Sequence, residues 1–477
     1  MYKNFKLYFE KHKRLKTILN YLYTFLIFFL ICLPAIIINF SMNYPMLYDE
    51  LEFFVPSIYS NHFMPFSFNV GRDARFLPFQ MLDYNLVLLF PDSFSKFHLV
   101  HQFLNLKFIL FIFCLYYCSK YVCELYKVKF SRFIFFCLTL SYITVKLFLF
   151  CTPVFSEITI AILFLVFIVI YLKAKIKQSK SLYIVSFFLM FYITYCKEIA
   201  FAIFFPLAFG NLIFNRKKIT KLDKIFYYSI ILNAVIFFVS YVILLNYLDR
   251  YDVYYNVNKL KSIKEYITYI EKVFKNNNML YICLLIYLYN IYKVLCKKDK
   301  YFDLHLLSLS GFVYAICSII LILPGFHYFS LSCILLFPMM FLIIGKIKYK
   351  KIVYVLFALL ICYSVKECCM KIYFSKIYFE QEKNLYDTLA EINKTEKICC
   401  LKYENNVYNM LSYVNNSWKN EKPKYYGFNS LKTDGDDCDI YLKMSDGKYH
   451  ENVMYFFYFG EVVYYLEPLK SSKFQFK

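Results

Sequence analysis

Charged side chains gather in one early stretch of a chain that is otherwise strongly apolar. Tyr48–Glu52 reads YDELE, and Gly71–Pro78 reads GRDARFLP about twenty residues later. A carboxylate can remove the proton from an acceptor hydroxyl, and arginines bind phosphate oxygens through paired hydrogen bonds. Together these residue types predict a reaction on a substrate that carries a phosphate.

The composition places this stretch in a membrane protein. The chain has 477 residues, of which 60% are hydrophobic and 22% aromatic, and its mean hydropathy is +0.47. Runs of roughly twenty apolar residues, the length that crosses a hydrocarbon core, recur along it. The formal net charge of +22 comes from short basic stretches between these runs. Such a distribution is typical of cytoplasmic loops and argues against nucleic acid as a partner.

The apolar runs predict an all-α polytopic protein with about eleven transmembrane helices. We expect them at about 17–40, 103–122, 133–151, 154–172, 182–196, 199–214, 225–247, 279–295, 304–323, 328–344 and 351–366. Lys and Arg concentrate in residues 1–16 and in the connections near 127–132, 173–180, 216–224, 293–300 and 346–351. These connections and the N-terminus are therefore predicted to be cytoplasmic. The exception is 248–278, which is also basic and includes a predicted amphipathic helix, Ile263–Phe274.

Two domains follow from this reading. Residues 1–366 form a transmembrane domain, and the odd number of spans places 367–477 outside the cytoplasm. In this more polar tail, a helix at about 374–394 precedes strand-like runs at Lys397–Tyr403, Asp439–Met444 and Val453–Phe459, with glycines between them. We expect a small extracytoplasmic α/β domain.

The first external loop, 41–102, is the longest connection in the transmembrane domain and carries both charged motifs. Its amphipathic stretches, Phe53–Tyr59 and Phe76–Leu89, are expected to lie flat at the membrane interface. The loop then presents acids and arginines at the height of the bilayer surface, where charged groups are costly to hold without a task. This placement suits a reaction on a lipid-linked phosphate.

Further ionisable groups are predicted at the same surface. Glu157 belongs to the turn Phe155-Ser156-Glu157 that joins the third and fourth spans, and Lys197 lies between the fifth and sixth, next to Glu198. Lys197 could contact phosphate, and Glu157 could contact a sugar or a metal ion. The alternative is a local ion pair at a helix turn, which contributes little. His327, at the ends of the ninth and tenth spans, either lines an acceptor cavity or has no chemical role.

The early motifs resemble those of the GT-C superfamily of integral membrane glycosyltransferases. An acidic pair directly after the first span (Tyr48-Asp49-Glu50), interfacial segments and a basic-aromatic-proline stretch (Gly71–Pro78) carry the resemblance. Ten or more spans followed by an extracytoplasmic domain also match. Within this superfamily, the chain is similar in its pattern of motifs to the protein O-mannosyltransferases and the lipid A aminoarabinose transferases. The likeness of motifs is confined to the first hundred residues, and some relatives place a lysine where this chain has arginines.

The resemblance implies transfer of a sugar from a polyprenyl-phosphate donor to a glycan, lipid or protein acceptor outside a bacterial inner membrane. Asp49 would be the catalytic carboxyl group, and Glu50 would support it or hold a divalent cation such as Mg²⁺ or Mn²⁺. Arg72 and Arg75 would bind the donor phosphate. The alternatives are that the acids cap an interfacial helix and that the arginines contact lipid headgroups.

Two other functions compete with this one. A transporter or flippase of lipid-linked glycans should place its charges within the spans, where Lys107 and Lys146 are the clear examples here. A polymerase of lipid-linked glycans uses a large loop late in the chain, whereas the acids here lie in the first loop. Convergence of Asp49, Glu157 and Lys197 in one cavity would favour the transferase.

Overall fold

The computed structural model describes residues 13–41, 67–69, 75–77, 79, 82–90, 96–145, 156–197, 199–247, 262–276, 279–296, 301–320, 326–347, 350–392, 398–400, 440–444, 454–458 and 461–468. The chain divides into two compact units. The first unit comprises 1–36, 105–150 and 155–368, and the second comprises 37–104, 151–154 and 369–477.

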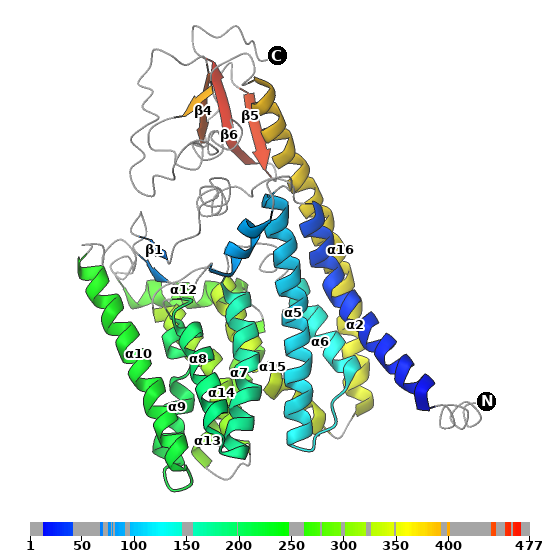
Figure 1. The fold of residues 1–477 in the computed structure, drawn as a ribbon. Coiled ribbons are helices and arrows are strands. Elements are labelled where there is room, and N and C mark those ends of the chain that lie inside the picture. Colours follow the sequence, from blue (N-terminus) through cyan, green and yellow to red (C-terminus); the bar gives the residue numbers. More distant parts are fainter. Residues whose placement is uncertain are drawn as a thin grey trace, which may run out of the picture. The chain divides into compact units, whose positions relative to one another are not determined.

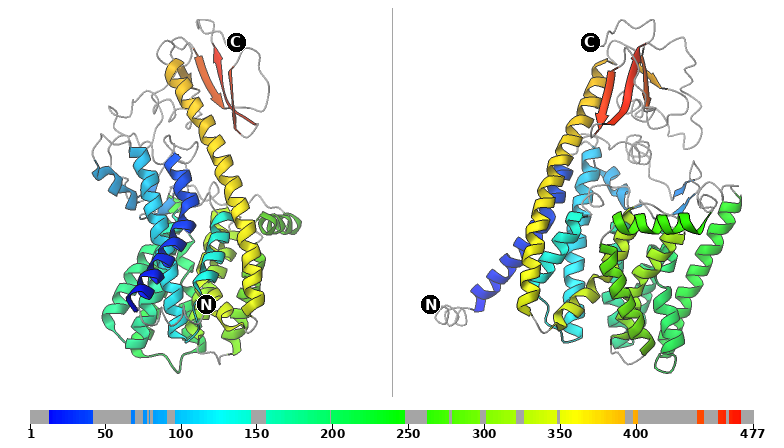
Figure 2. Two further views of the ribbon diagram at one scale, coloured as in Figure 1. Left: turned by 90° about the vertical axis from the view of Figure 1, so that its right-hand side faces the viewer. Right: turned by 180° about the vertical axis from the view of Figure 1, so that it is seen from behind.

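The first unit is built from helices, most of which run up and down beside one another (Figures 1 and 2). Three of its helices continue into the second unit: α2 (Lys13–Ser41), α5 (Lys96–Leu125) and α16 (Lys350–Ile392). The others are α6 (Arg132–Val145), α7 (Glu157–Lys177), α8 (Lys180–Thr194), the 3₁₀ segment η3 (Ala200–Ala202), α9 (Phe205–Phe214), α10 (Lys221–Tyr247), α12 (Ile263–Asn276), α13 (Met279–Cys296), α14 (Phe302–Ile320) and α15 (Phe326–Lys346).

Helical residues occupy each of the eleven predicted spans in the described part of the chain. Six helices, α2, α5, α7, α10, α14 and α16, are individually long and apolar enough to cross a membrane. The bent pair of α12 and α13 adds a seventh if it counts as one span, while α6, α8, η3 with α9, and α15 provide shorter apolar helices. The protein is therefore a multi-pass α-helical membrane protein, and the number eleven remains a prediction.

Large apolar side chains cover both the inward and the outward faces of these helices. Tyr227 and Phe237 of α10 are fully buried, whereas Tyr228 and Leu232 on the same helix are well exposed. Lipid tails are as apolar as the side chains, so close packing rather than exclusion from water must hold the helices together. The ring of Phe167 on α7, for example, packs edge-on against the ring of Phe204, and the two ring centroids are 4.8 Å apart.

One glycine marks a tight junction of three helices. The hydroxyl of Tyr287 on α13 donates a hydrogen bond to the carbonyl oxygen of Ser332 on α15 at 2.8 Å. A Cβ placed at Gly311 of α14 would lie 2.5 Å from each of these two oxygen atoms. Because that separation is shorter than van der Waals contact, only glycine lets α14 pack against this hydrogen bond.

In the second unit, the predicted interfacial stretch Phe76–Leu89 is not one continuous amphipathic segment. Strand β1 (Ser67–Asn69) pairs antiparallel with β2 (Arg75–Leu77), and a 3₁₀ helix, η1 (Leu82–Leu89), follows. Leu77 precedes Pro78 in the sequence, and the residue before a proline is driven toward extended backbone. This preference ends the helical pattern that hydrophobicity alone indicated. The other predicted stretch, Phe53–Tyr59, lies outside the described residues.

The tail contains a four-stranded sheet with the order β3-β4-β6-β5 (Figure 1). The strands are β3 (Ile398–Cys400), β4 (Ile440–Met444), β5 (Met454–Tyr458) and β6 (Glu461–Pro468). The β3–β4 pair is parallel, and the other two pairs are antiparallel. The first three strands lie within the three predicted strand-like runs, and β6 follows β5 after a short connection.

Helix α16 is longer than the sequence analysis predicts. It runs without interruption from Lys350 to Ile392, so the expected domain boundary at 366/367 lies inside a helix. The boundary between the two compact units falls at 368/369 of the same helix. A change from apolar to polar sequence along a helix marks a change of surroundings, but it does not break the backbone hydrogen bonds.

Candidate functional site

A buried ion pair joins two residues that the sequence analysis singles out separately. Glu157 is the first residue of α7, and Lys197 lies in the turn between α8 and η3. The ammonium group of Lys197 contacts Oε1 of Glu157. The side chain of Glu157 is fully buried and that of Lys197 is 4% exposed.

The local backbone explains how both charged groups are positioned. A glutamate in the first turn of a helix is favoured by the exposed N–H groups and the dipole there. After α8 ends, the carbonyl of Lys197 accepts a hydrogen bond from the N–H of Ala200 at 2.9 Å, which fixes the turn. The flanking residues Ile158, Cys196 and Ile199 are buried, so the pair lies in largely apolar surroundings.

Burial makes this pair energetically expensive. Taking two ions out of water costs several kcal/mol for each ion, and their attraction repays the cost only when the geometry is good. Ionisable residues inside a membrane helix bundle are functional-site candidates by default, for the same reason. The pair provides an ammonium group that could donate hydrogen bonds to a polar ligand and a carboxylate that could accept them.

The described partner of Lys197 lies far from it in the sequence. Glu198 is adjacent in sequence but lies outside the described residues, whereas Glu157 is forty positions earlier. Lys197 and Glu157 do form an ion pair, as in the alternative to ligand contacts, but this pair is buried rather than exposed. The pair is buried, and its energetics follow the rules for buried charges.

The structure leaves the other predicted site residues untested, because their side chains lie outside its described part. Asp49, Glu50 and Arg72 lie outside the described residues. Arg75 is the first residue of β2, and His327 is the second residue of α15; only their backbones are described. The predicted roles of these five residues therefore remain predictions.

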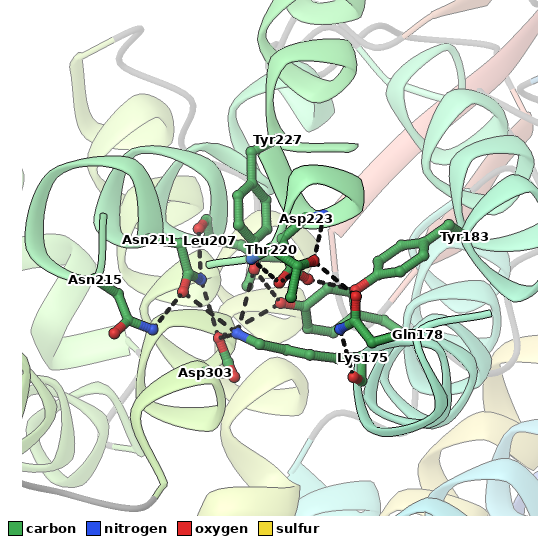
Figure 3. Close-up of polar contacts among 11 residues, drawn as sticks. Lys175, Gln178, Tyr183, Leu207, Asn211, Asn215, Thr220, Asp223, Tyr227 and Asp303 are labelled. Atoms are coloured by element: carbon green, nitrogen blue, oxygen red, sulfur yellow. Dashed lines mark hydrogen bonds and ion pairs between the residues drawn. The ribbon is translucent and has the colours of Figure 1, made fainter. Parts of the chain in front are cut away.

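A second charged cluster, which the sequence analysis missed, lies near the opposite end of α7 (Figure 3). Lys175 forms an ion pair with Oδ1 of Asp303 at 2.6 Å, and their side chains are 21% and 17% exposed. The amide of Asn211 donates to the same oxygen at 3.0 Å, and the ammonium group also lies 3.3 Å from the hydroxyl of Tyr227. The hydroxyls of Tyr171 and Tyr227 are 2.7 Å apart. We call these five residues the Lys175 cluster.

A capping interaction continues this polar region. Thr220 precedes α10, and its N–H donates to Oδ2 of Asp223 at 2.9 Å, while the N–H of Asp223 donates to the threonine hydroxyl at 3.2 Å. This reciprocal pattern is a capping box. The hydroxyl of Tyr183 on α8 donates to the other carboxylate oxygen of Asp223. Helices α8 and α10 are thereby joined at the same end as α7 and α14 (Figure 3).

The Lys175 cluster has the character of a structural joint. It connects α7, α9, α10 and α14, and each of its polar side chains has a hydrogen-bond partner within the cluster. In the sequence, Lys175 counts only as one of several cytoplasmic lysines. Asn211 within a predicted span and Asp303 at the edge of another were the available signals, because isolated polar residues in apolar runs need partners.

Metal ligands are not grouped in the described part of the chain. Within those residues, no three His, Cys, Asp or Glu side chains lie close enough together to hold an ion. The predicted role of Glu50 in binding Mg²⁺ or Mn²⁺ concerns a residue outside that part.

Comparison with known proteins adds no relative: no family model, curated protein or solved structure matches the chain. The resemblance to GT-C glycosyltransferases therefore rests on the motifs and the predicted layout of the sequence alone.

Proposed function

We propose that the protein is a membrane glycosyltransferase that moves a sugar from a polyprenyl-phosphate donor to an acceptor outside the cytoplasm. The buried Glu157–Lys197 pair is the observation that carries the proposal. It supplies a cation for a phosphate group at the end of the bundle where the sequence predicts the charged first loop. The charged motifs of that loop support the same assignment through the residue types they contain.

The proposed reaction needs a base, an electrophilic carbon and a stabilised leaving group. Asp49 removes the proton from the acceptor hydroxyl, whose oxygen attacks the anomeric carbon of the sugar. The bond from that carbon to the phosphate oxygen breaks, and polyprenyl phosphate leaves with both electrons. Lys197, Arg72 and Arg75 neutralise the phosphate in this scheme.

Lys197 is suited to this role because its ammonium group has three donors. One can remain on Glu157 while another binds a phosphate oxygen. Glu157 then keeps the lysine charged and oriented before the donor arrives. If Glu50 holds a divalent cation, that ion would supply additional positive charge to the departing phosphate.

A transporter of lipid-linked glycans is the second candidate, and one observation favours it. Helix α7 carries an ion pair near each end, Glu157–Lys197 and Lys175–Asp303. Alternating access requires closures at both ends of a bundle that open in turn. A transporter would need both pairs to break during its cycle, whereas the transferase needs only Lys197 to meet its substrate.

The test compares two lysines that both lie in ion pairs. In liposomes, sugar transfer is measured against the concentration of polyprenyl-phosphate sugar for the wild type, Lys197→Gln and Lys175→Gln. A charge-assisted hydrogen bond contributes roughly 1.5–3 kcal/mol, so Lys197→Gln should weaken donor affinity by about ten- to a hundredfold. Lys175→Gln is the matched control and should leave the donor dependence unchanged.

The two candidate functions give different outcomes. Equal loss of glycan movement in both variants, with no sugar transferred by the wild type, would favour the transporter. Wild-type donor affinity in a folded Lys197→Gln variant would remove Lys197 from donor binding. Acceptor affinity provides an internal reference, because the acceptor does not carry the donor phosphate.

A further inference from the structure

Helix α12 differs from its neighbours because it lies across the end of the bundle. Its axis turns by 104° from that of α13, and Figure 2 shows it crossing the ends of the upright helices. The helix begins at a clear cap, since the N–H of Glu265 donates to the hydroxyl of Ser262 at 3.2 Å. A capped start and fourteen residues make α12 a helix in its own right rather than a frayed end of a span.

One face of α12 is fixed to the bundle. The hydroxyl of Tyr266 lies 3.0 Å from the carbonyl oxygens of both Ile319 and Ile320, which close α14. The last carbonyls of a helix have no partner within it, so a hydroxyl there satisfies otherwise open acceptors. Tyr269 and Val273 follow at the spacing of one helical face, and Val273 is buried.

A second face is apolar and is exposed over its first two residues. Ile263, Ile267, Ile270 and Phe274 recur at the spacing of one helical stripe. Ile263 is 82% exposed and Ile267 is 52% exposed, although both are large aliphatic residues. We call these four residues the α12 stripe.

The third face is polar and separates the α12 stripe from the bundle on the other side. It consists of Lys264, Glu265, Thr268, Glu271, Lys272 and Lys275, all of which are exposed. Three lysines against two glutamates leave this face with a small positive charge. Such a face suits the headgroup region of a membrane, where Lys and Arg interact with lipid phosphates.

The α12 stripe continues into a surface that must face lipid. The ring of Phe274 lies 5.0 Å from that of Tyr281 on α13. On α13, exposed apolar residues then recur at the same helical spacing: Tyr281, Leu285, Leu288 and Tyr292. Since α13 belongs to the membrane-embedded bundle, we expect this outward stripe to border the lipid chains. The α12 stripe continues the apolar surface of α13 beyond the bend between the two helices.

We propose that α12 is an interfacial helix that buries the α12 stripe in the lipid leaflet at the end of the bundle where α14 finishes. Its bundle-facing side holds it by Tyr266, its apolar stripe enters the boundary between headgroups and acyl chains, and its lysines meet lipid phosphates. The occupant of the stripe is lipid because the stripe adjoins the outward apolar surface of α13.

The same end of the bundle carries the Glu157–Lys197 pair. The contact between Lys175 and Asp303 brings the end of α7 beside the start of α14, so these helices run in opposite directions. The end of α14, where α12 docks, therefore lies at the Glu157 end of α7. Docking α12 in the interface would hold this end at headgroup height, where the proposed donor carries its phosphate.

Tryptophan fluorescence tests the lipid contact directly, because the chain has a single tryptophan, Trp418. In a Trp418→Phe background, Ile267→Trp places a reporter on the stripe. Thr268→Trp is the matched control, since it lies about 100° further around the same helix. The full-length proteins are reconstituted in phosphatidylcholine vesicles whose acyl chains are brominated near the headgroup, and aqueous iodide is the second quencher.

The tryptophan at 267 should lose most of its emission in brominated lipid and little with iodide, and the control should show the reverse. Strong iodide quenching at both positions would overturn the proposal, because the stripe would face water. Quenching by neither agent at 267 would also overturn it and would indicate a protein cover, such as a second copy. Ile263→Trp with Lys264→Trp repeats the test if a variant at 267 does not fold. The readout is emission rather than sugar transfer, so it stands or falls independently of the proposed reaction.

Discussion

Helix α7 carries an ion pair near each end, and the two pairs differ in how they are accommodated. Glu157–Lys197 is almost completely buried, whereas the side chains of Lys175 and Asp303 each keep about a fifth of their surface exposed. The second pair is also crossed by hydrogen bonds from Asn211 and from a tyrosine hydroxyl.

In our proposal, this difference in exposure separates a structural joint from a site. A network that satisfies each polar member spreads the cost of burial and stabilises one arrangement of its helices. A pair with almost no exposed surface pays a larger desolvation cost, so its net contribution to stability is smaller. The sequence keeps such a pair at Glu157 and Lys197, which is why we place function there and architecture at the Lys175 cluster.

The largest expected effect comes from breaking the Glu157–Lys197 ion pair. Lys197→Met should destabilise the protein by about 3–5 kcal/mol, because it removes the ammonium group that the buried carboxylate of Glu157 contacts. Urea unfolding in detergent micelles, followed by circular dichroism, measures the change. The double variant Glu157→Leu/Lys197→Met should recover most of the stability but not the proposed transfer activity. A single variant as stable as the wild type would show that this end is more hydrated than its burial indicates.

An intermediate effect on stability is expected in the Lys175 cluster. Asp303→Asn keeps the shape of the side chain but removes the charge that Lys175 contacts, so the loss should be about 1–3 kcal/mol. The same unfolding measurement applies, with the donor dependence of the proposed reaction as the second readout. A large change in donor affinity without a loss of stability would contradict the structural assignment of this cluster.

The smallest effect on stability should follow removal of one hydroxyl group from the Lys175 cluster. Tyr171→Phe breaks the hydrogen bond to Tyr227 and should cost about 0.5–1.5 kcal/mol. Tyr292→Phe is a matched control on α13, because that ring is well exposed and should tolerate the change. Equal effects in the two variants would show that the hydroxyl of Tyr171 contributes nothing specific.

Hydrophobic periodicity predicted local elements well. Helices occupy the predicted spans, and the predicted amphipathic helix Ile263–Phe274 is confirmed within α12. Both follow from information carried by neighbouring residues: apolar runs, a stripe at helical spacing, and the Ser262 cap. The change to a strand at Phe76 was missed because a strand depends on a partner, here β1, which periodicity within one segment cannot reveal.

The sequence identified Glu157 and Lys197 as candidate site residues, but it did not predict that they contact each other. Glu157 and Lys197 stand out as charges at the ends of apolar runs, yet nothing in their own segments identifies them as partners. Their contact depends on how α7 and α8 pack. Asp303 was overlooked for the same reason, since its importance arises only when α14 brings it to Lys175.

The junction at Gly311 has an evolutionary consequence. The apolar residues around it can drift among Leu, Ile and Phe while total volume is conserved, but position 311 cannot gain even a methyl group without displacing the Tyr287–Ser332 hydrogen bond. In homologues that have diverged beyond overall similarity, a glycine here should persist, or change only together with residue 287. An alignment anchored on that covariation would identify distant members of this lineage better than its hydrophobic segments, whose composition many unrelated membrane proteins share.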